Sequence, residues 1–224
     1  MKKLVSVWAA LDFCLLVAGI LIITMSFLLS IGDDVVLKLF FREFDQKLGI
    51  ALGSTYIFAF VFSIPAIIQS AERGKLLKIQ SWLLLSIAVF TLTAGTIVWQ
   101  FSLGQLNNFS ILWAKEDIIV QQAIQDEFSC CGYWNGTTAG LFTATGGHCI
   151  DTAFAATQPG CQASITSSSP PGSDYVLNQL FTSIYGFEAI IGGLFLATLC
   201  IINERRLQVR FAMIDSKRGG SGFV

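Results

Sequence analysis

The chain has 224 residues, of which 54% are hydrophobic and only 13% are charged. A soluble globular domain carries about 25% charged residues, so this composition argues for a membrane protein. The net charge of −1 and the lack of a basic face exclude a nucleic-acid-binding module. We expect an all-α membrane protein, because helices satisfy their own backbone hydrogen bonds in lipid.

Four stretches are long and apolar enough to cross a bilayer, which takes about 20 residues with few charges. The first follows Met1-Lys2-Lys3, but it exceeds the roughly 7–15 residues of a signal-peptide core and therefore predicts a span. The four predicted spans are residues 4–30, 51–70, 79–103 and 183–203. They leave a small loop over 31–50, a shorter loop over 71–78, a long segment over 104–182 and a tail over 204–224.

Basic residues are unevenly divided between the two sides of these spans. Of the 14 Lys and Arg residues, ten lie on the side of the termini and of loop 71–78. They are Lys2, Lys3, Arg73, Lys75, Lys78, Arg205, Arg206, Arg210, Lys217 and Arg218. The other four are Lys38, Arg42, Lys47 and Lys115. The positive-inside rule therefore predicts cytoplasmic termini and an outer position for the long segment.

The outer segments differ in their patterns. The small loop is richer in apolar residues than a free loop requires, so we expect it to pack against the large segment or the membrane interface. In the large segment, Val120, Ile124 and Phe128 recur every four residues, which predicts helical structure over 105–128. The Gly-, Ser- and Thr-rich stretch 132–172 predicts loops. Ser173 or Asp174 is expected to cap the start of a helix that continues into the fourth span.

Two acidic residues lie inside predicted spans. Asp12 is about 12 Å and Glu188 about 22 Å from the inner edge at the helical rise per residue, so we do not expect them to pair. An ionisable group at such depth costs several kcal/mol unless it faces other helices. The plainer interpretation is a protonated or hydrogen-bonded packing residue, and the alternative is a proton or ion relay. The fourth span also carries Ala189, Gly193 and Ala197, whose spacing lets another helix approach closely.

Four of the six cysteines lie in the long outer segment, at Cys130, Cys131, Cys149 and Cys161. Disulfides persist on the outer side, which favours two structural bridges over a metal site. Four cysteines allow three pairings, and their spacing does not choose among them.

Three residues are candidates for modification. Asn135-Gly136-Thr137 and Asn108-Phe109-Ser110 are glycosylation sequons, and Asn135 is the better acceptor because Asn108 lies close to the third span. Cys200, near the inner edge of the fourth span, is a candidate for S-palmitoylation or else a plain packing thiol.

Catalysis finds little support in the sequence. His148 is the single histidine, and the chain has no Ser/His/Asp set, phosphate loop or metal-ligand cluster. We therefore expect no enzyme activity, no metal and no cofactor.

These residues resemble the tetraspanin family across nearly the whole chain. The family has four spans, a small and a large outer loop, and a CCG motif early in the large loop, as in Cys130-Cys131-Gly132. Pro159-Gly160-Cys161 is similar to the family's glycine-cysteine before the last helix, and Ala71-Glu72-Arg73-Gly74-Lys75-Leu76-Leu77 to its inner-loop pattern. Asp12 stands where the family usually has asparagine, and Thr91 where it usually has an acid or amide. The Cys-Cys-Gly-Tyr form is most like fungal tetraspanins, some of which are required for infection structures to penetrate a host.

The resemblance implies a four-helix bundle with a small, disulfide-stapled, mostly helical extracellular domain. It implies bridges Cys130–Cys161 and Cys131–Cys149, and a location in the plasma membrane or an endosomal or vacuolar membrane. Tetraspanins are scaffolds, so the implied partners are other integral membrane proteins, further copies of the chain, and a lipid or sterol between the spans. The rival hypothesis is a small ion or proton transporter or channel that uses Asp12 and Glu188.

Overall fold

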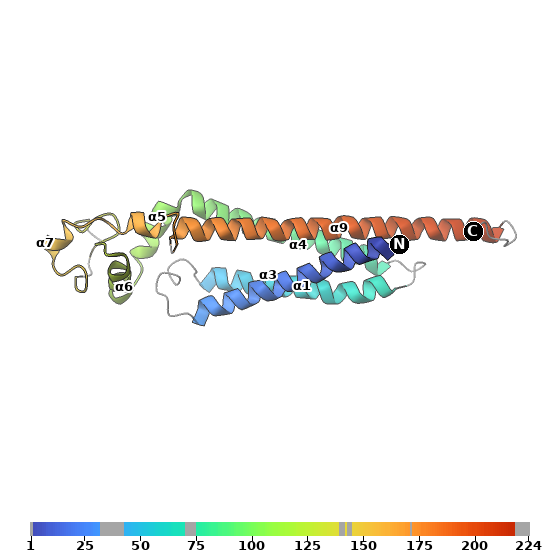
Figure 1. Cartoon of the computed structure of the whole chain (residues 1–224), viewed down its shortest axis with the longest axis horizontal. Helices are drawn as coiled ribbons and strands as arrows, with labels where there is room; N and C mark the ends of the chain where they lie inside the picture. The colour runs from blue at the N-terminus through green and yellow to red at the C-terminus, as the bar shows by residue number, and fades with distance from the viewer. Residues whose placement is uncertain are drawn as a thin grey trace. The chain divides into compact units, whose positions relative to one another are not determined.

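The computed structural model describes residues 2–31, 43–69, 75–138, 142, 145–170 and 172–217. Within this part of the chain the regular structure is helical (Figure 1). The helices are α1 (Lys2–Ile31), α3 (Glu43–Ile68), α4 (Lys75–Leu103), α5 (Gln105–Trp113), α6 (Ile118–Phe128), α7 (Thr152–Ala155), α8 (Gln162–Ile165) and α9 (Ser173–Lys217). Four of them, α1, α3, α4 and α9, are long and apolar enough to span a membrane, as an integral membrane protein requires.

The chain divides into two compact units. The first, which we call the span unit, comprises Met1–Met25, Leu48–Thr93 and Ile184–Val224. The second, which we call the disulfide unit, comprises Ser26–Lys47 and Ala94–Ser183. Helices α1, α3, α4 and α9 each contribute residues to both units, and each unit is described separately below.

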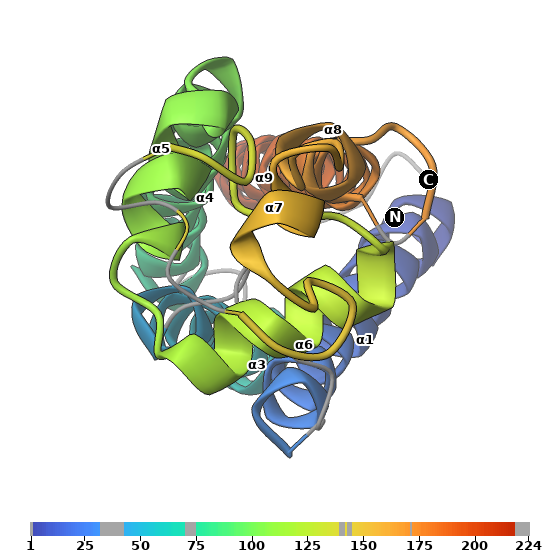
Figure 2. The same ribbon diagram turned by 90° about the vertical axis from the view of Figure 1, so that its left-hand side faces the viewer.

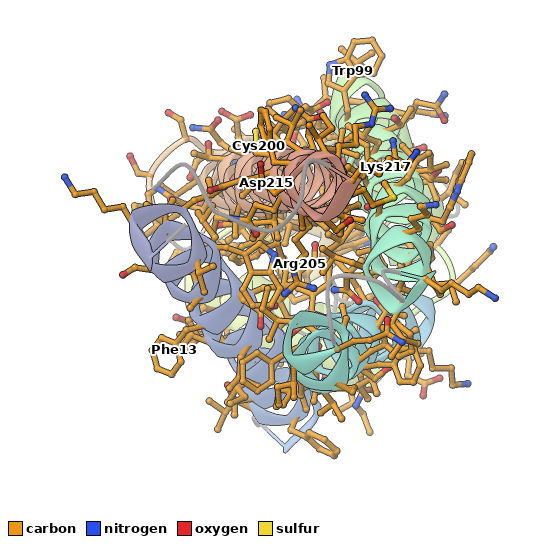
Figure 3. The ribbon with its side chains drawn as sticks, turned by 90° about the vertical axis from the view of Figure 1, so that its right-hand side faces the viewer. Phe13, Trp99, Cys200, Arg205, Asp215 and Lys217 are labelled. Carbon is orange, nitrogen blue, oxygen red and sulfur yellow. A yellow bond between two sulfur atoms is a disulfide. The ribbon has the colours of Figure 1, made fainter. Side chains whose placement is uncertain are left out.

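The span unit has one apolar core to which all four long helices contribute. In α9 the core residues recur at three- and four-residue intervals, which turns one face of that helix toward its neighbours. The opposite faces carry large exposed apolar side chains, such as Phe13 of α1 in Figure 3, and such a surface suits lipid rather than water. The buried core residues are Trp8, Leu15, Ala18, Leu52, Tyr56, Ala59, Ala66, Leu77, Leu84, Ile87, Ile191, Leu194, Ala197 and Ile201.

Small residues bring α1 and α3 into close contact. A Cβ added to Gly19 would lie 2.9 Å from the carbonyl oxygen of Gly53, and one added to Gly53 would lie 2.8 Å from that of Gly19. A Cβ at Gly193 would meet Leu11 at an ordinary 3.5 Å. The tightest helix approach among these glycines therefore lies between α1 and α3. On α9, Ala197 is buried in the core and Ala189 is exposed.

Several boundaries differ from those predicted. Helix α3 begins at Glu43, so the second half of the predicted loop 31–50 is helical. Helix α4 begins at Lys75, inside the predicted loop 71–78. The expected start of a helix at Ser173 is confirmed, but α9 continues to Lys217 through most of the predicted tail. The apolar residues of loop 32–42 and the motif residues 71–74 lie outside the described residues.

The disulfide unit is built from shorter pieces (Figure 2). The predicted helix 105–128 is two helices, α5 and α6, separated by 114–117. Stretch 132–172 holds the single-turn helices α7 and α8 and two isolated bridges, Asn135 with Pro159 and Gly146 with Cys149. The core of the disulfide unit is aromatic and sulfur-rich: Phe109, Leu112, Trp113, Ile124, Cys130, Tyr133, Cys161 and Ile165.

Candidate functional site

The cysteine cluster follows directly from the end of α6. Ser129 ends that helix in the left-handed conformation, with φ 50°, and turns the chain. Cys130 pairs with Cys161 and Cys131 with Cys149, across 31 and 18 residues, which is the pairing implied by the family resemblance. Two neighbouring cysteines thus tie one point of the chain to two distant points of the loop.

Gly132 is the residue that lets the chain turn away from the cysteines. Its φ is +69°, a conformation that residues with a Cβ rarely adopt, and a Cβ there would lie 2.3 Å from the carbonyl oxygen of Asn135. Its backbone N–H donates to the buried Gln125 Oε1 at 2.8 Å. The glycine of the motif therefore serves the backbone geometry next to the bridges.

Tyr133 anchors the turn in the aromatic core. The side chain is fully buried, packs against the rings of Trp113 and Trp134, and donates its hydroxyl to the carbonyl oxygen of Leu106 at 2.6 Å. Burial raises the pKa of Tyr133 to about 12, because a phenolate would lose its hydration there.

Backbone hydrogen bonds hold the segment around Cys161 beside the segment that follows Cys130. Cys131 N–H donates to Pro159, Cys161 N–H to Gly132, and Gln162 N–H to Tyr133. Gly160 fits between these segments because a Cβ there would lie 2.1 Å from the carbonyl oxygen of Trp134.

Helix α6 also holds the remaining loop through its polar face. Gln122 Nε2 donates to the carbonyl oxygen of Thr145 at 2.7 Å, and Asp126 Oδ1 accepts from the backbone N–H of His148 at 2.5 Å. The sequence alone did not indicate these contacts. Their signal was weak, because a polar helix face that meets a loop has the same composition as one that meets water.

Large apolar side chains remain exposed on the disulfide unit, whose frame is held by the two bridges. Ile119 at the start of α6 is 78% exposed, Ile150 after Cys149 is 71% exposed, and Trp134 after the motif is 38% exposed. Ile118 is also exposed. Such residues on a cross-linked frame are candidates for contact with another protein.

The two sequons differ in their surroundings. Asn135 is exposed, and its Oδ1 accepts hydrogen bonds from Thr137 and Thr138. Asn108 is partly buried, its Nδ2, the atom that would carry the sugar, donates to the carbonyl oxygen of Phe101 at 3.1 Å, and Ser110 is buried. The surroundings thus favour Asn135 as the acceptor.

In the span unit, Asp12 and its neighbours form polar contacts inside the core. Asp12 is buried, and its Oδ2 accepts a hydrogen bond from Ser63 of α3. Its Oδ1 and the Oε2 of Glu188 are buried without a hydrogen-bond partner among the described residues. Asp12 therefore bonds to Ser63 and not to Glu188, as its depth predicted.

Two further pairs cross this core. Tyr56 and Thr91 share a hydrogen bond of 2.9 Å between their hydroxyls, so Thr91 supplies a polar contact from α4. Trp8 Nε1 donates to Thr198 Oγ1 at 2.9 Å and joins α1 to α9. No pattern in a single helix signalled these pairs, because each joins residues on different helices.

Arg205 joins α9 to the C-terminal end of α3 within the span unit. Its guanidinium donates to the carbonyl oxygens of Ile67, near the end of α3, at 2.6 Å and of Gln69, just after α3, at 3.0 Å. Figure 3 shows Arg205 directed toward the centre of the four helices, and Cys200 on the outer side of α9. Cys200 is free and exposed, and Cys14 is exposed as well.

Comparison of the chain with protein-family models, with curated proteins and with solved structures found no match. Among the described residues, no three His, Cys, Asp or Glu side chains gather as a metal site requires.

Proposed function

We propose that this protein is a membrane scaffold of the tetraspanin type, which associates laterally with other integral membrane proteins. In this proposal α1, α3, α4 and α9 form a four-helix bundle with cytoplasmic termini, and the disulfide unit is an extracellular recognition domain. The resemblance carries the family assignment through the CCG motif and the four spans, and the ten basic residues on one side support the topology. No catalytic step is involved.

The observation that supports recognition is the exposure of Ile119 and Ile150 on a frame held by two disulfides. A rigid frame lowers the entropy lost on binding, since the contact residues are already ordered. Lateral partners can also contact the exposed apolar faces of the spans.

The test is purification from native membranes in mild detergent, followed by identification of the proteins that co-purify. We expect at least one stoichiometric integral membrane partner, and we expect Ile119→Ser and Ile150→Ser to reduce its recovery at unchanged expression. Glu127→Ser, at an exposed polar residue of α6 in the same unit, is the control. Recovery of the protein alone, with cross-linking that also finds no neighbour, would exclude the scaffold.

The topology has a separate test in glycosylation. If the disulfide unit is extracellular, enzymatic removal of N-glycans should increase the gel mobility of the wild-type chain. Asn135→Gln should abolish that shift and Asn108→Gln should leave it. A glycan-free wild type whose Lys115, an exposed amine of the disulfide unit, is protected from an impermeant amine reagent in intact cells would contradict the topology.

For the fungal resemblance, we propose a role in infection structures or polarised growth. The corresponding test is deletion of the gene in its native cell. Normal penetration and normal tip growth in the deletion strain would exclude that role.

A small ion or proton transporter is the second candidate, and the buried, unpartnered oxygens of Asp12 and Glu188 are the observation that favours it. Reconstitution into liposomes with an ion-flux assay separates the two proposals. Flux that disappears in both Asp12→Asn and Glu188→Gln would support transport, and absence of flux in the wild type would exclude it.

A further inference from the structure

Helix α9 extends beyond the ends of the other helices of the span unit. Arg205 lies level with the end of α3, because its guanidinium reaches the carbonyl oxygens of Ile67 and Gln69. Beyond it α9 continues to Lys217, which is roughly 18 Å at the helical rise per residue. Figure 1 shows this last part of α9 running past the N-terminus of α1. We call residues 206–217 the α9 extension.

The α9 extension keeps an apolar stripe although it has left the core. Leu207, Phe211 and Ile214 follow one another at intervals of four and three, so they share one face. They are 43%, 61% and 46% exposed. A helix that met only water would need no such stripe.

The stripe continues the lipid-facing side of the span. Cys200 lies on the outer side of α9 (Figure 3), and Leu196, four residues before it, is exposed as well. Seven-residue steps from Cys200 lead to Leu207 and Ile214. Arg205, which faces the core, lies on the opposite side. The apolar face that meets acyl chains in the span is therefore continuous with the apolar face of the α9 extension.

Basic residues border the stripe on one flank. Arg206, Arg210 and Lys217 share a face beside Leu207 and Ile214, and all three are exposed. This charge disfavours pairing with a second copy, since like charges would meet. It suits the anionic lipids of a cytoplasmic leaflet.

We propose that the α9 extension docks on the anionic surface of the cytoplasmic leaflet, with Leu207, Phe211 and Ile214 in the interface and Arg206, Arg210 and Lys217 on lipid headgroups. Docking requires a bend in α9 just after Arg205, where its hydrogen bonds to α3 end. The proposal rests on the cytoplasmic topology proposed above, but it is independent of the scaffold role.

The test uses the full-length chain with Cys14→Ser and Cys200→Ser, reconstituted in vesicles. A nitroxide is attached at Ile214→Cys on the stripe or, as a control, at Ser216→Cys off the stripe. Collision with oxygen, which partitions into lipid, is compared with collision with a water-soluble nickel chelate. In phosphatidylcholine–phosphatidylserine vesicles, position 214 should favour oxygen and position 216 the nickel chelate. In phosphatidylcholine alone, both should favour nickel.

Charge variants sharpen the result. Arg206→Gln with Arg210→Gln should lower the ratio of docked to undocked extension roughly 25-fold, at about fivefold per basic residue near an anionic surface. Gln208→Ala is the matched control and should leave the ratio unchanged. Nickel accessibility at position 214 in both vesicles, or equal protection in neutral vesicles, would overturn the proposal. So would protection that appears only when an acidic protein such as calmodulin is added, since the occupant would then be a protein.

Discussion

The span unit and the disulfide unit solve the same problem of burial by different means. The core of the span unit is mainly aliphatic and is assembled from four long helices, with polar contacts such as Asp12–Ser63 and Trp8–Thr198 inside it. The disulfide unit has short helices, an aromatic core and two cross-links. The first unit bonds its own backbone within helices, whereas the loops of the second rely on cross-links and a few long-range hydrogen bonds. Different substitutions should therefore destabilise the two units.

The largest expected effect comes from the disulfides, which only one unit contains. Paired substitution Cys130→Ser and Cys161→Ser should lower the free energy of unfolding of the disulfide unit by about 3–4 kcal/mol, because the open chain regains loop entropy. Hydrogen exchange should accelerate in residues 118–165 and stay slow in residues 184–203. Simultaneous loss of protection in both units would break the comparison, since they would then fold as one.

The next effect concerns the α1–α3 contact. Gly53→Ala should destabilise the span unit by about 1–3 kcal/mol, because the new Cβ meets Ile23 and the carbonyl oxygen of Gly19 under 3 Å. Gly193→Ala is the control, with its nearest neighbour at 3.5 Å. The measurement is unfolding in detergent, with circular dichroism as the readout. Alanine favours helix over glycine by about 1 kcal/mol, so a gain in stability at Gly53 would contradict the tight contact.

Tyr133 gives a smaller and pH-dependent effect in the disulfide unit. Tyr133→Phe should cost about 1 kcal/mol through the lost hydrogen bond to Leu106. The pKa of Tyr133 is raised to about 12 in the folded unit, against an ordinary pKa of about 10 when unfolded. Its contribution is therefore complete below pH 10 and is lost as the pH rises toward 12, because only the unfolded chain then releases the proton.

The wild-type-minus-variant absorbance of phenolate isolates this titration. We expect a midpoint well above that of a free tyrosine. An ordinary midpoint with the unit still folded would show that Tyr133 is hydrated.

The smallest effect is expected at Asp12. If this residue is a packing group, Asp12→Asn keeps an oxygen that can accept from Ser63 and should change stability by about 0.5 kcal/mol or less. Surface expression and partner recovery should also be unchanged. Loss of activity with normal expression would instead support the transport hypothesis.

The sequence by itself determined the four spans, the separation of a cysteine-bearing segment and the helix that starts at Ser173. These features depend on hydropathy over about 20 residues and on local turn chemistry, both of which a linear pattern carries. The pairing of Cys130 with Cys161 needed the family resemblance as well, because spacing alone leaves three choices.

Only the tertiary structure decided which side chains meet. Three examples join residues far apart in the sequence. They are the contact between Gly19 and Gly53, the hydrogen bond between Asp12 and Ser63, and the hydrogen bonds from Arg205 to the C-terminal end of α3. Such contacts depend on the rotation of each helix about its axis, and a span that is apolar on all sides carries little signal of that rotation. For the same reason, the small residues of α9 predicted a close helix approach but did not indicate which helix would make it.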